Sequence, residues 1–104
     1  MAFYMWSGAY TADEVKAMVE TPQDREVLAR QAIESLGGKL HHYFFSFGQH
    51  DIIVIMEFAD DVDMAALALR VTSNGYFSHG ETTKLLTSAD AMSAMSRAKA
   101  AIES

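Results

Sequence analysis

Aromatic and β-branched residues cluster in four short runs along this chain, and polar or turn-forming residues separate the runs. The runs predict strands over residues 3–7, 40–47, 51–58 and 76–86. Between and after them, apolar residues recur three or four positions apart, which is the spacing of an amphipathic helix. The pattern therefore predicts a mixed chain of strands and helices.

Capping residues indicate where the first two helices begin. Thr11 lies three residues before Glu14, which is the spacing of a capping box. Thr21 precedes Pro22, and proline is well tolerated in the first turn of a helix. We therefore expect Thr21 to cap a second helix that runs to about Leu36.

Glycines and further capping residues delimit the remaining helices. Gly37 is expected to end the second helix in a left-handed conformation. Asp60 or Asp61 caps a third helix, which Gly75 closes, and Thr87 begins a terminal helix.

The resulting order is β-α-β-β-α-β with an extra C-terminal helix, which is that of a ferredoxin-like α+β fold. Right-handed crossovers place both main helices on one face of an antiparallel sheet with the strand order 4-1-3-2. With 104 residues, the chain is expected to form a single ferredoxin-like domain over residues 1–104.

The connection between the second and third strands contains a structural motif. Gly48 and Gln49 fit a two-residue hairpin of type II′, which requires a positive φ at its first position. Asp51 then enters the next strand, where a carboxylate is normally disfavoured, and we expect it to accept hydrogen bonds from turn amides.

Two strands of the predicted sheet are apolar on both faces. Residues 52–56 are all apolar, whereas a strand with one solvated face should alternate. Alternation along the second strand puts Leu40 and Phe44 on one face and Tyr43, Phe45 and Phe47 on the other. Since helices cover one face only, the other face is expected to pack on a second copy, as in a dimeric α+β barrel. The terminal helix is an alternative cover for part of that face.

A homo-oligomer of this kind would enclose an apolar space between paired sheets. The residues predicted to line it and to bind a small apolar or aromatic ligand are Trp6, His42, Phe44, Ser46 and Thr83. The alternative is a dry, fully packed interface.

The four histidines are the candidates for acid–base chemistry, and they are predicted not to form a metal site within one subunit. His41 and His42 are adjacent in a strand and should point to opposite faces. His79 lies on the other edge strand, about 14 Å away across three strand spacings. His50 is expected at the opposite end of the sheet. His79 and Glu81 share one face, where a solvated pair is the simplest interpretation.

Composition excludes several classes of function. The net charge is −6 and no cluster of basic residues is present, so nucleic acid is not an expected partner. Without cysteine, disulfides and thiolate chemistry are excluded. No basic segment precedes an apolar stretch at the N-terminus and no run is long enough to span a bilayer, so we expect a cytoplasmic protein with no membrane partner.

Several short stretches together carry a family resemblance, and they are Tyr4, Gly8 to Thr11, Arg25, Leu36 to Gly38 and Gly48 to Ile53. In these stretches the chain resembles the GYD-domain proteins, small bacterial proteins of the dimeric α+β barrel type. The eponymous tyrosine is replaced here by His50, so no role of that phenol is implied. The resemblance implies the fold and no particular activity.

Three functions remain open on the sequence alone. The first is a homo-oligomer that binds a small apolar or aromatic molecule between sheets. The second, suggested by the fold class, is an oxygenase, isomerase or haem-dependent enzyme that uses His42, His50 or His79 as a base or an axial ligand. The third is a structural subunit or partner-binding module.

Overall fold

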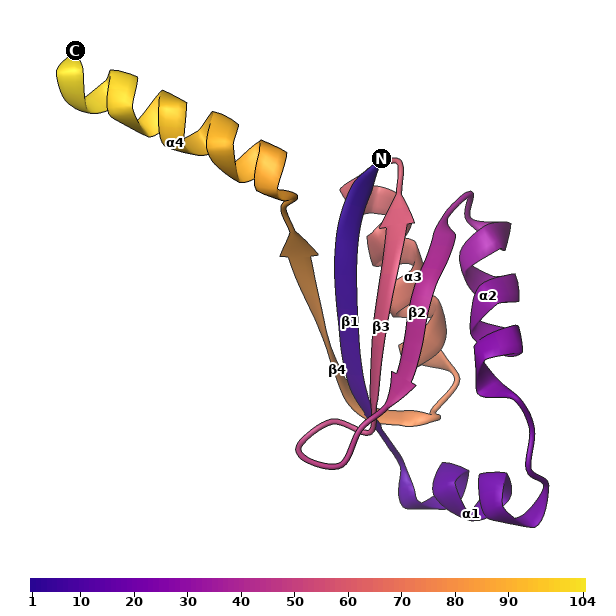
Figure 1. Ribbon diagram of the computed structural model, residues 1–104. Coiled ribbons are helices and arrows are strands. Elements are labelled where there is room, and N and C mark those ends of the chain that lie inside the picture. The colour runs from indigo at the N-terminus through magenta and orange to yellow at the C-terminus, as the bar shows by residue number, and fades with distance from the viewer.

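A computed structural model describes residues 1–104, and its elements follow the predicted order (Figure 1). The four strands form one antiparallel sheet with the order β2-β3-β1-β4, which confirms the predicted topology read from its other edge. The elements are β1 (Ala2–Tyr10), α1 (Ala12–Glu20), α2 (Arg25–Ser35), β2 (Lys39–Phe45), β3 (Ile52–Phe58), α3 (Asp61–Ser73), β4 (Phe77–Leu85) and α4 (Ser88–Glu103).

Side-chain caps begin every helix, although one cap differs from the prediction. Thr11, Asp60 and Thr87 each accept a hydrogen bond from the backbone N–H three residues later. The predicted cap Thr21 instead ends α1, because its N–H donates to the carbonyl of Ala17. The chain then passes Pro22, and α2 begins only after Asp24, whose side chain accepts from the Glu26 amide.

Gly37 ends α2 as predicted. Its φ is +78°, and its amide donates to the Glu34 carbonyl while the Gly38 amide donates to the Ile33 carbonyl. These two bonds form a Schellman motif. Gly75, with φ of +79°, closes α3 in the same left-handed region.

Helices α2 and α3 cover one face of the sheet, and the hydrophobic core lies between them and the strands. Alternate side chains of each strand point toward α2 and α3. Examples that are at most 4% exposed are Tyr4 and Trp6 of β1 and Val54 and Met56 of β3. Helix α1 lies beyond one end of the sheet (Figure 1). The other face, here called the open face, has no helix on it.

Helix α4 does not cover the open face of its own chain. It contains no buried residue and extends away from the sheet (Figure 1). The chain is accordingly elongated, with extents of 61 × 29 × 21 Å. None of the helices is long and apolar enough to cross a membrane.

A β-bulge in β2 overturns the predicted alternation of that strand. The register passes from Leu40 opposite Met56 to His42 opposite Ile55, so His41 is an extra residue. Leu40 therefore lies on the core side while Phe44, opposite Ile53, lies on the open face. Simple alternation predicts one face for both residues, and the bulge is the reason that they lie on different faces.

His41 and His42 consequently do not point to opposite faces, contrary to the sequence-based expectation. The His41 Nε2 atom lies 2.7 Å from Glu57 Oε1, and its ring lies 5.4 Å from that of Phe3. His42 stacks on Phe44, with ring centroids 5.6 Å apart. Both contacts are made on the open face.

The predicted two-residue hairpin is wrong. Strand β2 ends at Phe45 and β3 begins at Ile52, and Gly37 and Gly75 are the only residues with positive φ, so Gly48 does not form a type II′ turn. The longer loop is closed by the Ser46 amide, which donates to the Asp51 carbonyl at 2.8 Å.

Asp51 is structural, but its side chain and its amide bond to β1 and not to the turn amides. Its side chain accepts from the Tyr10 amide at 2.8 Å, where the β1–β4 register shifts. Its own amide donates to the Gly8 carbonyl at 2.8 Å. Asp51 thus fastens the loop to the end of the central strand.

Replacing Gly48 with Ala is expected to change the free energy of unfolding by less than about 0.5 kcal/mol, because a Cβ there meets open space and φ is not positive. The matched variant Gly37→Ala should lose about 1 to 2 kcal/mol, because alanine is strained at φ of +78° although no atom crowds it. Denaturant titration compares the two. A destabilised Gly48→Ala would contradict the loop geometry.

A buried phenol ties β1 to the start of α3. The Tyr4 hydroxyl donates to Asp61 Oδ1 at 2.6 Å, and Lys84 of β4 donates to the same oxygen at 2.8 Å. The hydrogen bond to Asp61, together with burial, raises the pKa of Tyr4 to about 12. The hydrogen bonds from Lys84 and Tyr4 lower the pKa of Asp61.

These shifts predict a pH dependence of stability. Because the folded pKa of Tyr4 is raised above 10.0, its contribution is complete below pH 10.0 and is lost as pH rises toward about 12. Asp61 acts in the opposite sense, and its contribution is lost as pH falls through its lowered pKa. Melting temperatures of wild type and Tyr4→Phe should therefore differ most at intermediate pH and converge in strong alkali. A constant difference across the alkaline range would refute the assignment.

Candidate ligand-binding site

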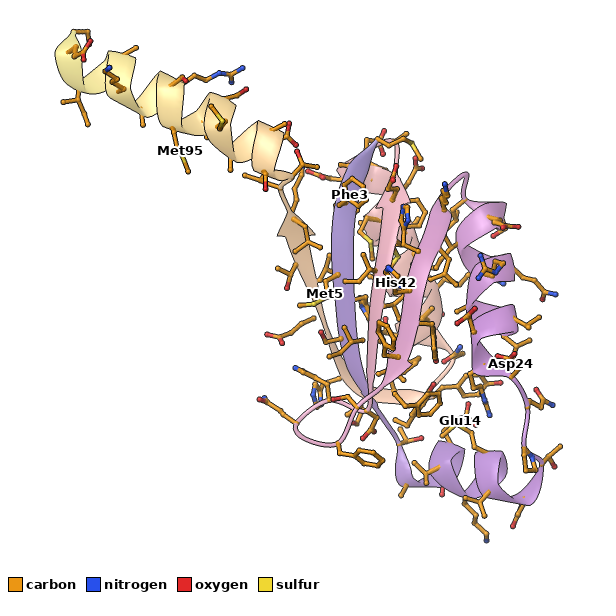
Figure 2. The ribbon with its side chains drawn as sticks, viewed as in Figure 1. Phe3, Met5, Glu14, Asp24, His42 and Met95 are labelled. Carbon is orange, nitrogen blue, oxygen red and sulfur yellow. The ribbon has the colours of Figure 1, made fainter.

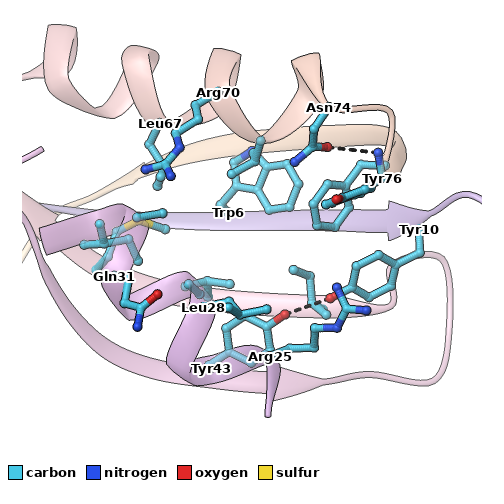
Figure 3. Close-up of a pocket in the computed structure, with 18 residues that line it drawn as sticks. Trp6, Tyr10, Arg25, Leu28, Gln31, Tyr43, Leu67, Arg70, Asn74 and Tyr76 are labelled. Atoms are coloured by element: carbon cyan, nitrogen blue, oxygen red, sulfur yellow. Dashed lines mark hydrogen bonds between the residues drawn. The ribbon is translucent and has the colours of Figure 1, made fainter. Parts of the chain in front are cut away.

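A pocket opens between α2 and α3 above the sheet (Figure 3). Its volume is about 360 Å³, and 14 of its 18 lining residues are hydrophobic. Small-molecule sites commonly have this size and are mostly apolar with a few polar groups. The walls come from α2 and α3, and the floor comes from the strands.

Trp6 forms the centre of the floor, and two glycines make its position possible. Gly8 and Gly80 are cross-strand neighbours on β1 and β4. A Cβ on Gly8 would lie 2.5 Å from two carbons of the Trp6 ring, and a Cβ on Gly80 would also overlap that ring. The indole therefore lies across bare backbone, where any larger residue would displace it.

Further aromatic rings extend the floor toward the end of β1. Phe77 meets Trp6 edge to face at 4.8 Å and stacks on Tyr10 at 4.7 Å. Such contacts are favourable beyond simple burial. The pocket thus has a continuous aromatic surface from Trp6 to Tyr10.

The pocket has a polar end formed by two phenols and an arginine. The hydroxyls of Tyr10 and Tyr43 lie 2.8 Å apart and share a hydrogen bond (Figure 3). Burial raises the pKa of both phenols, and the charge of Arg25 acts against that rise. Arg25, from the first turn of α2, forms an ion pair with Glu14 of α1 at 3.2 Å.

Polar side chains of α2 and α3 line other parts of the pocket. Arg70 donates to Ser35 Oγ at 3.1 Å, and Asn74 accepts from the Tyr76 amide at 2.9 Å. Gln31 lies on the α2 side, and Figure 3 shows Arg70 and Arg25 on opposite sides of the pocket.

The structure divides the sequence-predicted ligand residues between two faces. His42, Phe44 and Thr83 lie on the open face, and Ser46 lies just beyond the end of β2. Trp6 lies on the other face, at 4% exposure, beneath α2 and α3. Figure 2 shows His42 on the same side of the sheet as Phe3 and Met5.

His50 and His79 come together, contrary to the expectation that they lie at opposite ends of the sheet. Their rings are 5.4 Å apart, and His50 Nε2 lies 3.1 Å from Glu81 Oε2. The reason is topological, since β3 and β4 both run antiparallel to β1 and so begin at the same end of the sheet.

None of the four histidines lines the pocket between α2 and α3. No group of three or more His, Cys, Asp or Glu side chains is arranged to hold a metal ion. The histidine cluster with Glu81 therefore lies apart from the cavity.

Sequence reasoning did not assign Tyr10, Tyr43 and Arg25 to a site. A signal was available for two of them, because Tyr10 and Arg25 belong to the stretches that resemble GYD-domain proteins. Tyr43 could not be placed beside them without knowledge of the bulge in β2.

Comparison with known proteins supports the fold and a family. The chain is similar in structure to MtbAldR (TM-score 0.62, 13% identity, 83% of this chain and 53% of that one), so it spans about half the length of MtbAldR. It is similar to FFRP-DM1 (TM-score 0.58, 14% identity, 83% of this chain and 100% of that one). It is also similar to the hypothetical protein PHS023 from Pyrococcus horikoshii (TM-score 0.57, 15% identity, 84% and 92%).

At these identities the likenesses concern the fold alone. A search of curated proteins gave no match. The family model of the GYD domain matches residues 4–95, which is most of the chain. This chain belongs to the GYD domain family.

Proposed function

We propose that this protein is a homo-oligomeric binding protein that holds a small aromatic molecule in the pocket between α2 and α3. The observation that carries the proposal is the aromatic floor of Trp6, Phe77 and Tyr10 beneath an apolar cavity of about 360 Å³. Flat rings offer a large contact area to another flat ring, so they favour an aromatic ligand. This pocket replaces the space between paired sheets as the proposed binding site.

A binding test can use the single tryptophan of the chain as a reporter. The indole N–H of Trp6 gives one resonance in nitrogen–proton correlation spectra, and a ligand on the floor of the pocket should shift it. Naphthalene and indole are suitable probes because both are flat and uncharged. If neither probe shifts the Trp6 resonance or raises the melting temperature, the proposal fails.

Filling the pocket should remove binding. Ala29→Phe places a ring into the cavity from α2, and we expect naphthalene affinity to fall at least about tenfold, which corresponds to about 1.4 kcal/mol. Val27→Phe is the matched control, because Val27 lies on the same helix, is half exposed and does not line the pocket. Titration calorimetry compares the two. Equal affinities would place the binding site elsewhere.

The homo-oligomeric part of the proposal is supported by the open face of the sheet. Its apolar side chains form a continuous surface that no element of the chain covers. A surface of this kind on a small protein marks an interaction site, and a second copy related by a two-fold axis would cover it with the same residues. These apolar residues are Phe3, Met5, Phe44, Ile53, Ile55 and Leu85.

Helix α4 supports the same assembly. Met92, Met95 and Ile102 lie on one side of the helix at 67% exposure or more, and α4 has no buried residue. In proteins, most of the stability of a helix comes from packing of its apolar side against other elements. A second copy of the domain would supply the surface on which this side of α4 packs.

A further inference from the structure

The polar end of the pocket holds hydrogen-bond donors that the protein leaves unused. Each phenol has one O–H, and the Tyr10–Tyr43 bond uses only one of the two protons. Arg25 bonds Glu14 through Nη1, while its Nε–H is buried and has no partner. A buried donor without a partner is costly, and a ligand can supply the missing acceptor.

The donors keep their protons at physiological pH. Burial raises the pKa of Tyr43 and of Tyr10 above the ordinary value of 10.0, so both remain neutral phenols. An arginine is always protonated. The polar end therefore presents donors to any group that enters it.

The charges around these donors disfavour an anion. The Arg25 charge is already balanced by Glu14, whose carboxylate is 7% exposed. Asp51 lies near Tyr10 and Asp24 near Tyr43, and both raise the pKa of those phenols. The other lining cation, Arg70, bonds Ser35 and lies on the opposite side of the pocket (Figure 3). A carboxylate at the Tyr10–Tyr43 end would therefore meet no net positive charge, whereas a neutral acceptor avoids the repulsion.

We propose that the ligand is an uncharged aromatic compound with a carbonyl oxygen, as in an aryl ketone or amide. This inference rests on the proposed function. The ring lies on Trp6 and Phe77, and the carbonyl accepts from Arg25 Nε and from the free phenolic O–H of the Tyr10–Tyr43 pair. The apolar floor supplies the contact area, and the two donors fix the orientation.

Three probes of the same ring separate the alternatives. They are 2-acetylnaphthalene, which has a neutral carbonyl, 2-ethylnaphthalene, which lacks an acceptor, and 2-naphthoate, which is an anion. We expect 2-acetylnaphthalene to bind about tenfold more tightly than 2-ethylnaphthalene, because one or two hydrogen bonds to buried donors are gained. We expect 2-naphthoate to bind no more tightly than 2-ethylnaphthalene.

Phenol deletions test the donors directly. The double variant Tyr10→Phe, Tyr43→Phe keeps both rings of the pocket and removes both hydroxyls. The ratio of 2-acetylnaphthalene affinity to 2-ethylnaphthalene affinity should shrink in this variant to about threefold or less. Tyr4→Phe is the matched control, because it removes a buried phenol that does not line this pocket. It should keep the full tenfold preference.

The outcomes distinguish the inference from the function on which it rests. If the ketone and the hydrocarbon bind equally, the carbonyl inference is overturned while the aromatic site stands. Tighter binding of 2-naphthoate than of the ketone also overturns it, in favour of an anionic ligand. If none of the three probes binds, the proposed function fails with it.

Discussion

Replacing Gly80 with Ala is expected to destabilise the protein by about 1 to 3 kcal/mol, the usual range for overpacking a filled core. The added Cβ would overlap the Trp6 ring, which lies flat on Gly80 and Gly8. Trp6 is 4% exposed and packs on Phe77, so the ring can escape only into the ligand pocket. Denaturant titration measures the loss, and the same variant should bind naphthalene more weakly because the displaced indole occupies the cavity.

A double-mutant cycle isolates the contact with Trp6. In a Trp6→Leu background the Gly80→Ala change should cost much less, because the ring that the Cβ overlaps is gone. Gly48→Ala is the control, since a Cβ there meets nothing within 4 Å. If Gly80→Ala is equally harmful with and without Trp6, the indole does not lie where the structure has it.

The fold could be predicted from local sequence patterns, because residues at the ends of each helix and strand mark where it begins and ends. Thr11, Asp60 and Thr87 cap helices with their own side chains, and Gly37 and Gly75 adopt the positive φ that only glycine takes easily. The strand order then follows from the order of elements and the handedness of crossovers.

The irregular features of the fold could not be predicted from the sequence patterns. A bulge inserts His41 into β2, and no glycine or proline marks its position in the sequence. Every later side chain of that strand therefore lies on the face opposite to the one that simple alternation predicts. Gly48 resembles a hairpin glycine, but the loop it belongs to is set by Asp51, which bonds β1. These contacts depend on tertiary neighbours.

The predicted ligand residues fall on two faces of the sheet for a related reason. Strand β1 is apolar on both faces, with Phe3 and Met5 on one and Tyr4 and Trp6 on the other. Alternation groups these residues correctly but does not say which group lies under the helices. Trp6 was therefore predicted to bind a ligand beside His42, whereas the two lie on opposite faces.

Replacing Ile55 with Lys is expected to convert the proposed oligomer into a monomer. Ile55 lies on central strand β3, between Met5 of β1 and His42 of β2, and its side chain points into the open face. In a two-fold assembly each copy would bury this residue against the other, so the substitution places unpaired charges in an apolar interface. Since the face is uncovered within one chain, the domain itself should stay folded, which circular dichroism can establish.

Sedimentation velocity measures the change in assembly, with Val62→Lys as the control. Val62 is 75% exposed on α3, far from the open face, so the same charge there should leave the oligomer intact. If wild type sediments as a monomer at micromolar concentration, or if Ile55→Lys sediments as wild type does, the open face is not the interface. Aromatic probes should still bind the Ile55→Lys monomer, because the pocket between α2 and α3 is built from one chain alone. If Ile55→Lys loses both the oligomer and the binding of aromatic probes, the pocket depends on assembly.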